Sequence, residues 1–176
     1  MPTIKKQMIA DKLEELLEHK SVDKITVKEL VDACGISRQG FYYHFQDIME
    51  VIEWSIARAL QNAVEISLAA ATPQEAVKDV ILSMRENRKM IRHLMSSQRR
   101  PEVERLLVQT VRIYLAQMFQ AKAKGLSIAP GDLEAAIHFY SYGLVGMLVE
   151  HLEETDADRL AKQICGLLTG EIWNKS

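Results

Sequence analysis

The sequence is poor in cysteine, proline and aromatic residues, and it lacks a long apolar run. Two cysteines, Cys34 and Cys165, are too few for a disulfide framework or a cysteine-rich zinc site. No apolar stretch approaches the roughly 20 residues that a membrane helix needs, and no apolar signal segment follows Lys5 and Lys6. We therefore expect a soluble, cytoplasmic chain with reduced cysteines and no membrane partner.

Patterns of catalytic chemistry are also missing. The histidines do not pair at the spacing of a helical metal site, and they have no cysteine or paired carboxylate of that kind nearby. There is no phosphate-cradling glycine loop, no G-x-S-x-G turn and no G-x-G-x-x-G motif. The sequence predicts no catalytic residue, no metal and no cofactor, so an enzyme is the least favoured function class.

The net charge is close to zero. The whole chain carries a formal charge of −2, and residues 1–47 contain seven Lys and Arg against eight Asp and Glu. A domain-wide basic patch, the usual footprint of nucleic-acid binding, is therefore absent. A local cationic face is still available, because Lys24, Lys28 and Arg38 flank two predicted helix N-termini.

Helical periodicity runs through the chain, which predicts an all-α fold without strands. A length of 176 residues with 48% hydrophobic content suits a small head and a larger body. The longer predicted helices span residues 3–19, 47–70, 73–87, 101–124, 132–152 and 156–173. Asp47, Thr72 and Pro73 are start signals, and Gly125 is a stop signal. We interpret the cationic run at residues 85–100 as a solvated face, with binding of an anionic ligand, nucleic acid or protein as the alternative.

Residues 25–45 have the most specific pattern. Thr26 can cap a helix through its hydroxyl while Glu29 reaches back to the Thr26 amide. The apolar residues of this helix recur at helical spacing: Val27, Leu30, Val31 and Cys34. Gly35 can end it in a left-handed conformation, and Ser37 can cap a second helix that reaches Phe45. Two short helices around a glycine turn are a helix-turn-helix.

The second helix of this motif normally lies in the major groove of double-stranded DNA. Arg38 and Gln39 can each make paired hydrogen bonds to a base, and Gly40 allows a close approach of the backbone. We assign the remaining predicted DNA-binding residues to the phosphate backbone or to the helix start: Thr26, Lys28, Ser37, Tyr42, Tyr43 and His44.

At these residues the sequence resembles the amino-terminal signature of the TetR family of bacterial one-component transcription regulators. The matching positions are Thr26, Val27, Leu30, Ala33, Gly35, Ile36, Ser37, Gly40, Tyr42, His44 and Phe45. The resemblance implies a homodimer with a three-helix DNA-binding head, residues 1–47, and a helical ligand-binding and dimerisation body, residues 48–176. One position departs from the pattern: Ile48 stands where the family often has a lysine near a phosphate.

A ligand pocket in the body is implied chiefly by the resemblance. Its candidate lining combines apolar side chains with a few polar tips: Trp54, Met84, Met95, Tyr114, Met118 and Tyr142. Methionine and aromatic side chains at helical spacing are also typical of an ordinary core. Trp54 and Arg58 lie one turn apart and could line this cavity, whereas ordinary packing for Trp54 and solvation for Arg58 are the alternative.

The two carboxy-terminal helices are the predicted dimer interface, because the resemblance implies a four-helix bundle across a two-fold axis. The candidate residues follow helical spacing: Ala136, Tyr140, Gly143, Met147, Leu160, Ile164, Leu167 and Leu168. Gly143 and Gly146 reduce helix propensity, which close approach of another helix would explain. Packing within one chain would give the same pattern.

We interpret the chain as a DNA-binding transcription regulator that binds a near-palindromic operator as a homodimer. Repression is the commoner activity in the family, and the implied signal is a small-molecule effector or a partner protein. The alternative is a protein-interaction module that keeps the helix-turn-helix without binding DNA, which the acidic balance and Ile48 favour.

Overall fold

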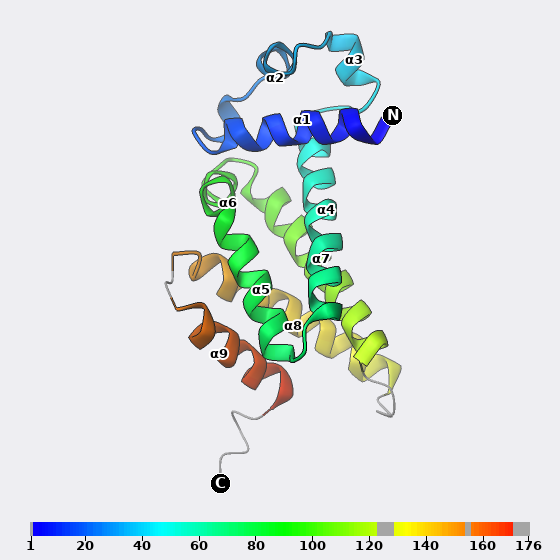
Figure 1. The fold of residues 1–176 in the computed structure, drawn as a ribbon, viewed down its shortest axis with the longest axis vertical. Helices are drawn as coiled ribbons and strands as arrows, with labels where there is room; N and C mark the ends of the chain where they lie inside the picture. Colours follow the sequence, from blue (N-terminus) through cyan, green and yellow to red (C-terminus); the bar gives the residue numbers. More distant parts are fainter. Residues whose placement is uncertain (1, 123–128, 154–155, 171–176) are drawn as a thin grey trace. The chain divides into compact units, whose positions relative to one another are not determined.

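The computed structural model describes residues 2–122, 129–153 and 156–170, and within these ranges it contains helices and no strand (Figure 1). The helices are α1 (Pro2–Leu17), η1 (Val22–Lys24), α2 (Val27–Cys34), α3 (Arg38–Tyr42), α4 (Ile48–Ala69), α5 (Pro73–Glu86), α6 (Arg88–Met95), α7 (Arg100–Lys122), α8 (Pro130–Glu150) and α9 (Ala157–Thr169). The predicted all-α class is confirmed. The predicted stop at Gly125 and the predicted helix end at Trp173 lie outside the described residues.

The chain divides into two compact units, and the division falls inside helices α4 and α7. The first unit comprises Met1–Ala59 and Lys89–Leu106, and the second comprises Leu60–Arg88 and Leu107–Ser176. The predicted boundary between residues 47 and 48 falls at the start of α4, whereas this division falls inside α4. The division also groups α6 from Lys89 onwards and the start of α7 with the head.

In the first unit, α1 packs against α2, and α2 leads through a tight turn to α3 (Figure 1). The largest buried side chains of the unit are aromatic or aliphatic: Ile9, Leu13, Leu17, Leu30, Phe41, Phe45, Val51 and Val103. Phe41 is completely buried, and replacing such a residue by Ala typically costs about 3–5 kcal/mol. Helix α3, which contains Phe41, therefore rests on a packed core.

Helix α6 was not predicted as a separate element. Its apolar residues Ile91 and Leu94 are buried, while Arg88, Lys89 and Arg92 are exposed. This outward placement agrees with the solvated face proposed for the cationic run. Within the first unit, the His93 imidazole also makes a 2.6 Å hydrogen bond to the Leu17 carbonyl oxygen of α1.

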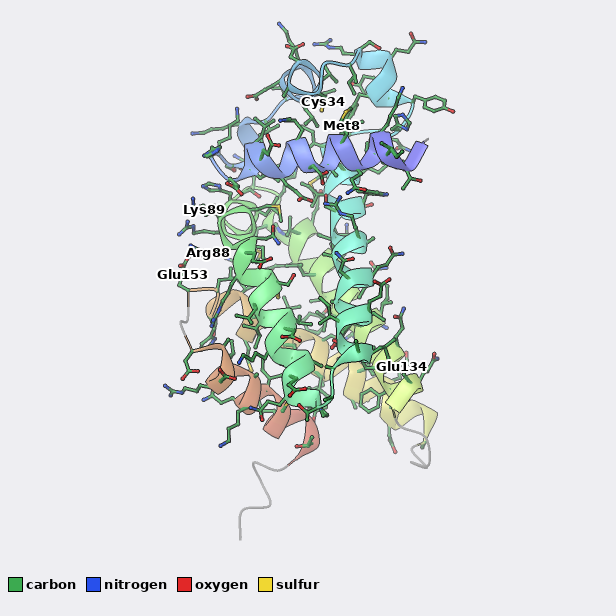
Figure 2. All side chains as sticks on the ribbon, in the orientation of Figure 1. Met8, Cys34, Arg88, Lys89, Glu134 and Glu153 are labelled. Carbon is green, nitrogen blue, oxygen red and sulfur yellow. The ribbon has the colours of Figure 1, made fainter. Side chains whose placement is uncertain are left out.

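The second unit has a core between α5 and α9 onto which residues of α8 pack (Figure 1). The start signal predicted at Thr72 and Pro73 is confirmed at the start of α5, where Thr72 and Glu75 form a capping box. At the start of α9, the Asp156 side chain accepts the Arg159 amide at 2.9 Å. Arg88 and Glu153 approach each other at 3.9 Å in this unit (Figure 2). A search of the described residues finds no helix that meets the length and hydropathy needed to cross a bilayer.

Candidate nucleic-acid interface

The turn between α2 and α3 is built as the sequence predicts. Gly35 has φ 65° and ψ 32°, a left-handed conformation that a residue with a Cβ adopts only at a cost. The Ile36 amide then donates to the Val31 carbonyl at 3.1 Å, which closes the end of α2. This geometry fixes the direction in which α3 leaves the turn.

Hydroxyl caps begin both helices of the motif. The Glu29 amide donates to Thr26 Oγ1 at 3.2 Å, and the Gly40 amide donates to Ser37 Oγ at 3.0 Å. The sequence also predicts that the Thr26 amide donates to the Glu29 carboxylate. In the structure the Glu29 carboxylate pairs with Lys20 instead. The remaining amides at the two helix starts are available to an anion such as a phosphate.

Gly40 has a structural role that the sequence did not reveal. A Cβ at this position would lie 3.3 Å from Ser37 Oγ, which is tighter than most side-chain contacts. A larger residue would therefore press on the α3 cap. The absence of a side chain at Gly40 therefore protects the cap.

Most predicted DNA-binding residues are exposed to solvent. Their side chains come from the starts of both helices and from the end of α3: Thr26, Lys28, Ser37, Arg38, Gln39, Tyr42 and Tyr43. Gly40 and His44 are half-buried. Tyr43 is 80% exposed, and its ring stacks edge-on against His44 with the centroids 5.0 Å apart. The structure thus places donors suited to bases and phosphates around one short helix.

Ion pairs explain how a head with slightly negative formal charge can present cations. Arg58 contacts Asp11 at 2.8 Å and Glu14 at 3.0 Å, and Lys12 contacts Glu15 at 2.5 Å. Glu29 is paired with Lys20, as noted above. By contrast, three cations of the motif make no ion pair within the described part of the chain: Lys24, Lys28 and Arg38. Four acidic side chains of the head, Asp11, Glu14, Glu15 and Glu29, are thus held in ion pairs, whereas the cations near the helix starts make none in the described part of the chain.

Arg58 and Trp54 make contacts that brace the head. The Arg58 guanidinium lies 5.2 Å from the Trp54 ring centre while it pairs with α1. The Trp54 ring in turn meets the Phe45 ring edge-on, with the centroids 6.4 Å apart. This chain of contacts joins α4 to α1 and to Phe45, three residues after the end of α3.

Cys34 is the last residue of α2, the helix that packs against α1 (Figure 2), and it is half-buried. Burial raises the pKa of the Cys34 thiol, although the neighbouring Lys12 ammonium acts in the opposite direction. A raised pKa disfavours the reactive thiolate at neutral pH. This agrees with a packed thiol.

The six predicted pocket residues have different surroundings. Trp54 and Met95 belong to the first unit, and the other four belong to the second. Tyr114 donates or accepts a 2.7 Å hydrogen bond with the buried Ser67 hydroxyl, and burial raises the Tyr114 pKa. Tyr142 is 59% exposed. Met84 and Met118 are half-buried.

Several predicted interface residues pack inside their own chain. Leu160 and Ile164 are 1% exposed, in a cluster with Ile81 of α5. Met147 and Leu168 pack against the same cluster, and Tyr140 donates a hydrogen bond to the Leu167 carbonyl at 3.3 Å. Ala136 is half-buried. The inward face of α8 and α9 is thus occupied by intrachain contacts, the alternative that the sequence left open.

The opposite face of α8 is exposed along its length. The exposed residues recur every three to four positions: Ala135, His138, Phe139, Tyr142, Gly143 and Gly146. Phe139 is 74% exposed. A Cβ added at Gly143 or Gly146 would meet nothing within 4 Å, so nothing described in this chain requires a glycine there.

Sequence reasoning also missed a hollow in the first unit, called here the η1–α4 hollow. It has a volume of about 420 Å³ and is lined by residues of η1, the starts of α2 and α4, and the α6–α7 turn: Val22, Asp23, Ile25, Val27, Asp47, Ile48, Met49, Gln98 and Arg99. These segments are far apart in sequence, and no motif signals their meeting. Ile48, the first residue of α4, contributes its half-buried side chain to the lining.

Two family models match the chain. The model for bacterial regulatory proteins of the tetR family matches residues 9–53, and the model for a transcriptional regulator C-terminal region matches residues 71–170. No curated protein sequence matches significantly.

Solved structures of regulators share the fold. The dihydroxyacetone kinase operon activator DhaS is 17% identical, with 97% of each chain covered and a TM-score of 0.73. The TetR family repressor AlkX from Dietzia sp. strain DQ12-45-1b is 14% identical, with 94% of this chain and 96% of AlkX covered and a TM-score of 0.61. NalD from Pseudomonas aeruginosa, the secondary repressor of the MexAB-OprM efflux pump, is 18% identical, with 93% and 94% covered and a TM-score of 0.56.

Proposed function

The chain belongs to the TetR family of bacterial regulatory proteins, and from this premise we propose that it is a homodimeric repressor that binds a near-palindromic operator. The observation that carries the proposal is the exposed, capped α3 with Arg38 and Gln39 at its start. These two side chains read base edges in the major groove. Thr26, Lys28 and the α3 tyrosines position the motif on the phosphate backbone.

We assign the dimer contact to the exposed face of α8. Phe139 and Tyr142 supply apolar area, while Gly143 and Gly146 allow a second helix to approach closely. A glycine inside a helix costs roughly 1 kcal/mol relative to alanine, and no contact within the described chain offsets that cost. Intermolecular packing of α8 gives these glycines a role. Leu160 and Ile164 then support the interface from the chain's own core.

We propose repression because it is the commoner activity in the family and because two proteins of similar structure are repressors. AlkX and NalD are both described as repressors, whereas DhaS is described as an operon activator. The proposed signal that controls operator binding is a small-molecule effector or a partner protein.

Selection of bound genomic fragments at two salt concentrations tests this function. The expected result is a two-fold symmetric site near a small number of genes, with weaker recovery at the higher salt concentration because phosphate contacts release counterions. Transcription from a reporter carrying the site then gives the sign of regulation. Failure to recover any fragment above background at low salt would reject DNA binding.

The second candidate function is a protein-interaction module that does not bind DNA. Ile48 favours it, because an apolar side chain at the start of α4 offers a phosphate no positive charge. The formal negative charge of residues 1–47 points the same way, although ion pairs compensate much of it. The fragment selection separates the two candidates.

A further inference from the structure

The η1–α4 hollow has the size of a small-molecule site and a lining of both polar and apolar side chains. Its volume of about 420 Å³ falls within the range of about 300–1,000 Å³ that is usual for ligand pockets. The apolar part of the lining includes Val22 and Ile25, whose side chains are 6% and 5% exposed, and the half-buried Ile48 and Met49. Charged and polar side chains form the rest: Asp23, Asp47, Gln98 and Arg99. A ligand with an apolar body could bury that body here.

The mouth of the hollow carries an excess of negative charge. Asp23 and Asp47 line it together with Arg99, and all three side chains are exposed. The Arg99 guanidinium is already paired with Glu102 at 3.0 Å. Asp47 and Asp23 also act electrostatically on this guanidinium. Three carboxylates therefore outnumber the one cation of the lining, and a second cation would be attracted to this mouth.

Each aspartate keeps one oxygen available. Asp23 Oδ2 accepts the Gln98 amide at 3.0 Å and the Ser21 hydroxyl at 3.2 Å, while Asp47 Oδ1 accepts the Glu50 amide at 2.9 Å. Within the described residues, Asp23 Oδ1 and Asp47 Oδ2 accept no hydrogen bond. These existing bonds hold both carboxylates in place, so a ligand ammonium would meet preorganised acceptors.

We propose that the η1–α4 hollow binds a hydrophobic amine, with the apolar body against Val22, Ile25 and Ile48 and the ammonium group between Asp23 and Asp47. An anionic ligand is disfavoured by the carboxylates, and a purely apolar ligand would leave their charge unused. The site lies within the first unit and is separate from the body pocket expected from the family resemblance.

The position of the hollow couples it to DNA binding, a step that rests on the proposed function. Its walls include the start of α2, which carries Lys28, and the start of α4, which follows the recognition segment. A ligand that contacts both segments favours one arrangement of them. Operator and amine must then change each other's affinity by the same factor.

The test uses the full chain without DNA and two probes, 1-naphthylmethylamine and its neutral analogue 1-naphthylmethanol. Binding is followed by titration calorimetry and by the methyl resonances of the isoleucines. We expect the amine to shift Ile25 and Ile48 but not Ile164, which lies in the core of the second unit. The alcohol should bind about tenfold more weakly, because it forms no ion pair with the two carboxylates.

The variants Asp23→Asn and Asp47→Asn remove charge while keeping an acceptor for Gln98 and for the α4 cap, since Asn also caps helices. Each should weaken the amine by about two- to fivefold and leave the alcohol unchanged. Asp32→Asn, on the exposed side of α2, is the matched control and should leave both probes unchanged.

Three results would overturn the site. The amine and the alcohol could bind equally tightly, Asp32→Asn could weaken the amine as much as Asp23→Asn and Asp47→Asn do, or neither probe could bind at millimolar concentration. The coupling has a separate test on the operator recovered in the fragment selection. An operator affinity that is the same with and without saturating amine would overturn the coupling. Because probe binding is measured without DNA, its failure is distinguishable from a failure of the proposed operator function.

Discussion

The molecule exposes aromatic pairs on two helices, and the surroundings of the two pairs differ. On α3, Tyr42 and Tyr43 are 57% and 80% exposed, beside capped helix starts and cations that make no ion pair in the described chain. On α8, Phe139 and Tyr142 are 74% and 59% exposed, beside two glycines whose added Cβ atoms would meet nothing.

The two aromatic pairs are similarly exposed, but their surroundings suit different partners. The tyrosines of α3 end in hydroxyls among polar neighbours, a composition that suits phosphates and bases. Phe139 has no polar group, and its glycine neighbours suit a closely packed helix. Exposed apolar area marks a contact surface, and its neighbours indicate the kind of contact.

The largest expected effect comes from breaking the α8 surface. Phe139→Arg should raise the dimer dissociation constant by about 100-fold, because a desolvated charge would oppose its own copy across the two-fold axis. Sedimentation velocity over a range of concentrations measures the constant. Ile113→Arg, which alters another exposed apolar residue of the second unit, is the control. A dimer that tolerates Phe139→Arg as well as the control contradicts the assignment.

On α3 the sharpest change is Arg38→Ala. It should cost about 1–3 kcal/mol at a guanine of the operator and relax the preference for that base. Fluorescence anisotropy with the operator and its single-base variants measures both effects. Arg112→Ala removes an exposed arginine of α7 and should change neither. If Arg38→Ala leaves the base preference unchanged, the assignment of α3 as the helix that contacts the bases is wrong.

Gly146→Ala should act in opposite directions on the single chain and on the dimer. In a Phe139→Arg background it should raise the free energy of unfolding by about 1 kcal/mol, because alanine favours the helix. In the unaltered chain it should raise the dimer dissociation constant by about tenfold through overpacking. Urea unfolding and sedimentation measure the two effects.

Gly131→Ala is the control for this prediction. An added Cβ at Gly131 also meets nothing within 4 Å, but Gly131 lies in the first turn of α8. It should leave the dimer constant unchanged. Tighter association of the Gly146→Ala chain would show that α8 does not approach its copy at this glycine.

The smallest expected effect is that of Lys28→Ala. Loss of one phosphate contact should lower affinity alike for all sequences and reduce the slope of log affinity against log salt by about one. The measurement is anisotropy at several salt concentrations, with Lys162→Ala on the exposed face of α9 as control. An unchanged slope would place Lys28 away from the phosphates.

The local signals of the fold were predictable from sequence. The caps at Thr26, Ser37 and Thr72 and the left-handed Gly35 depend on residues within four positions, so their chemistry is visible in the sequence. The exposed motif residues follow from the same local logic.

The sequence did not predict which residues that are distant in the chain contact each other. The contacts of Asp23 with Gln98 and of Arg58 with Asp11 join segments separated by many residues, and periodicity carries no information on such pairs. The same limit applies to α8, which is apolar on several faces. Its spacing predicts a helix but does not say whether Met147 or Phe139 faces the chain's own core.

The mass of the complex formed on the recovered operator tests the central claim most directly. Sedimentation equilibrium with a labelled DNA fragment gives the number of chains bound per symmetric site. The account predicts two chains on one site with two half-sites, joined through α8 and reading DNA through α3. One chain per site, or a bound sequence without two-fold symmetry, would contradict it.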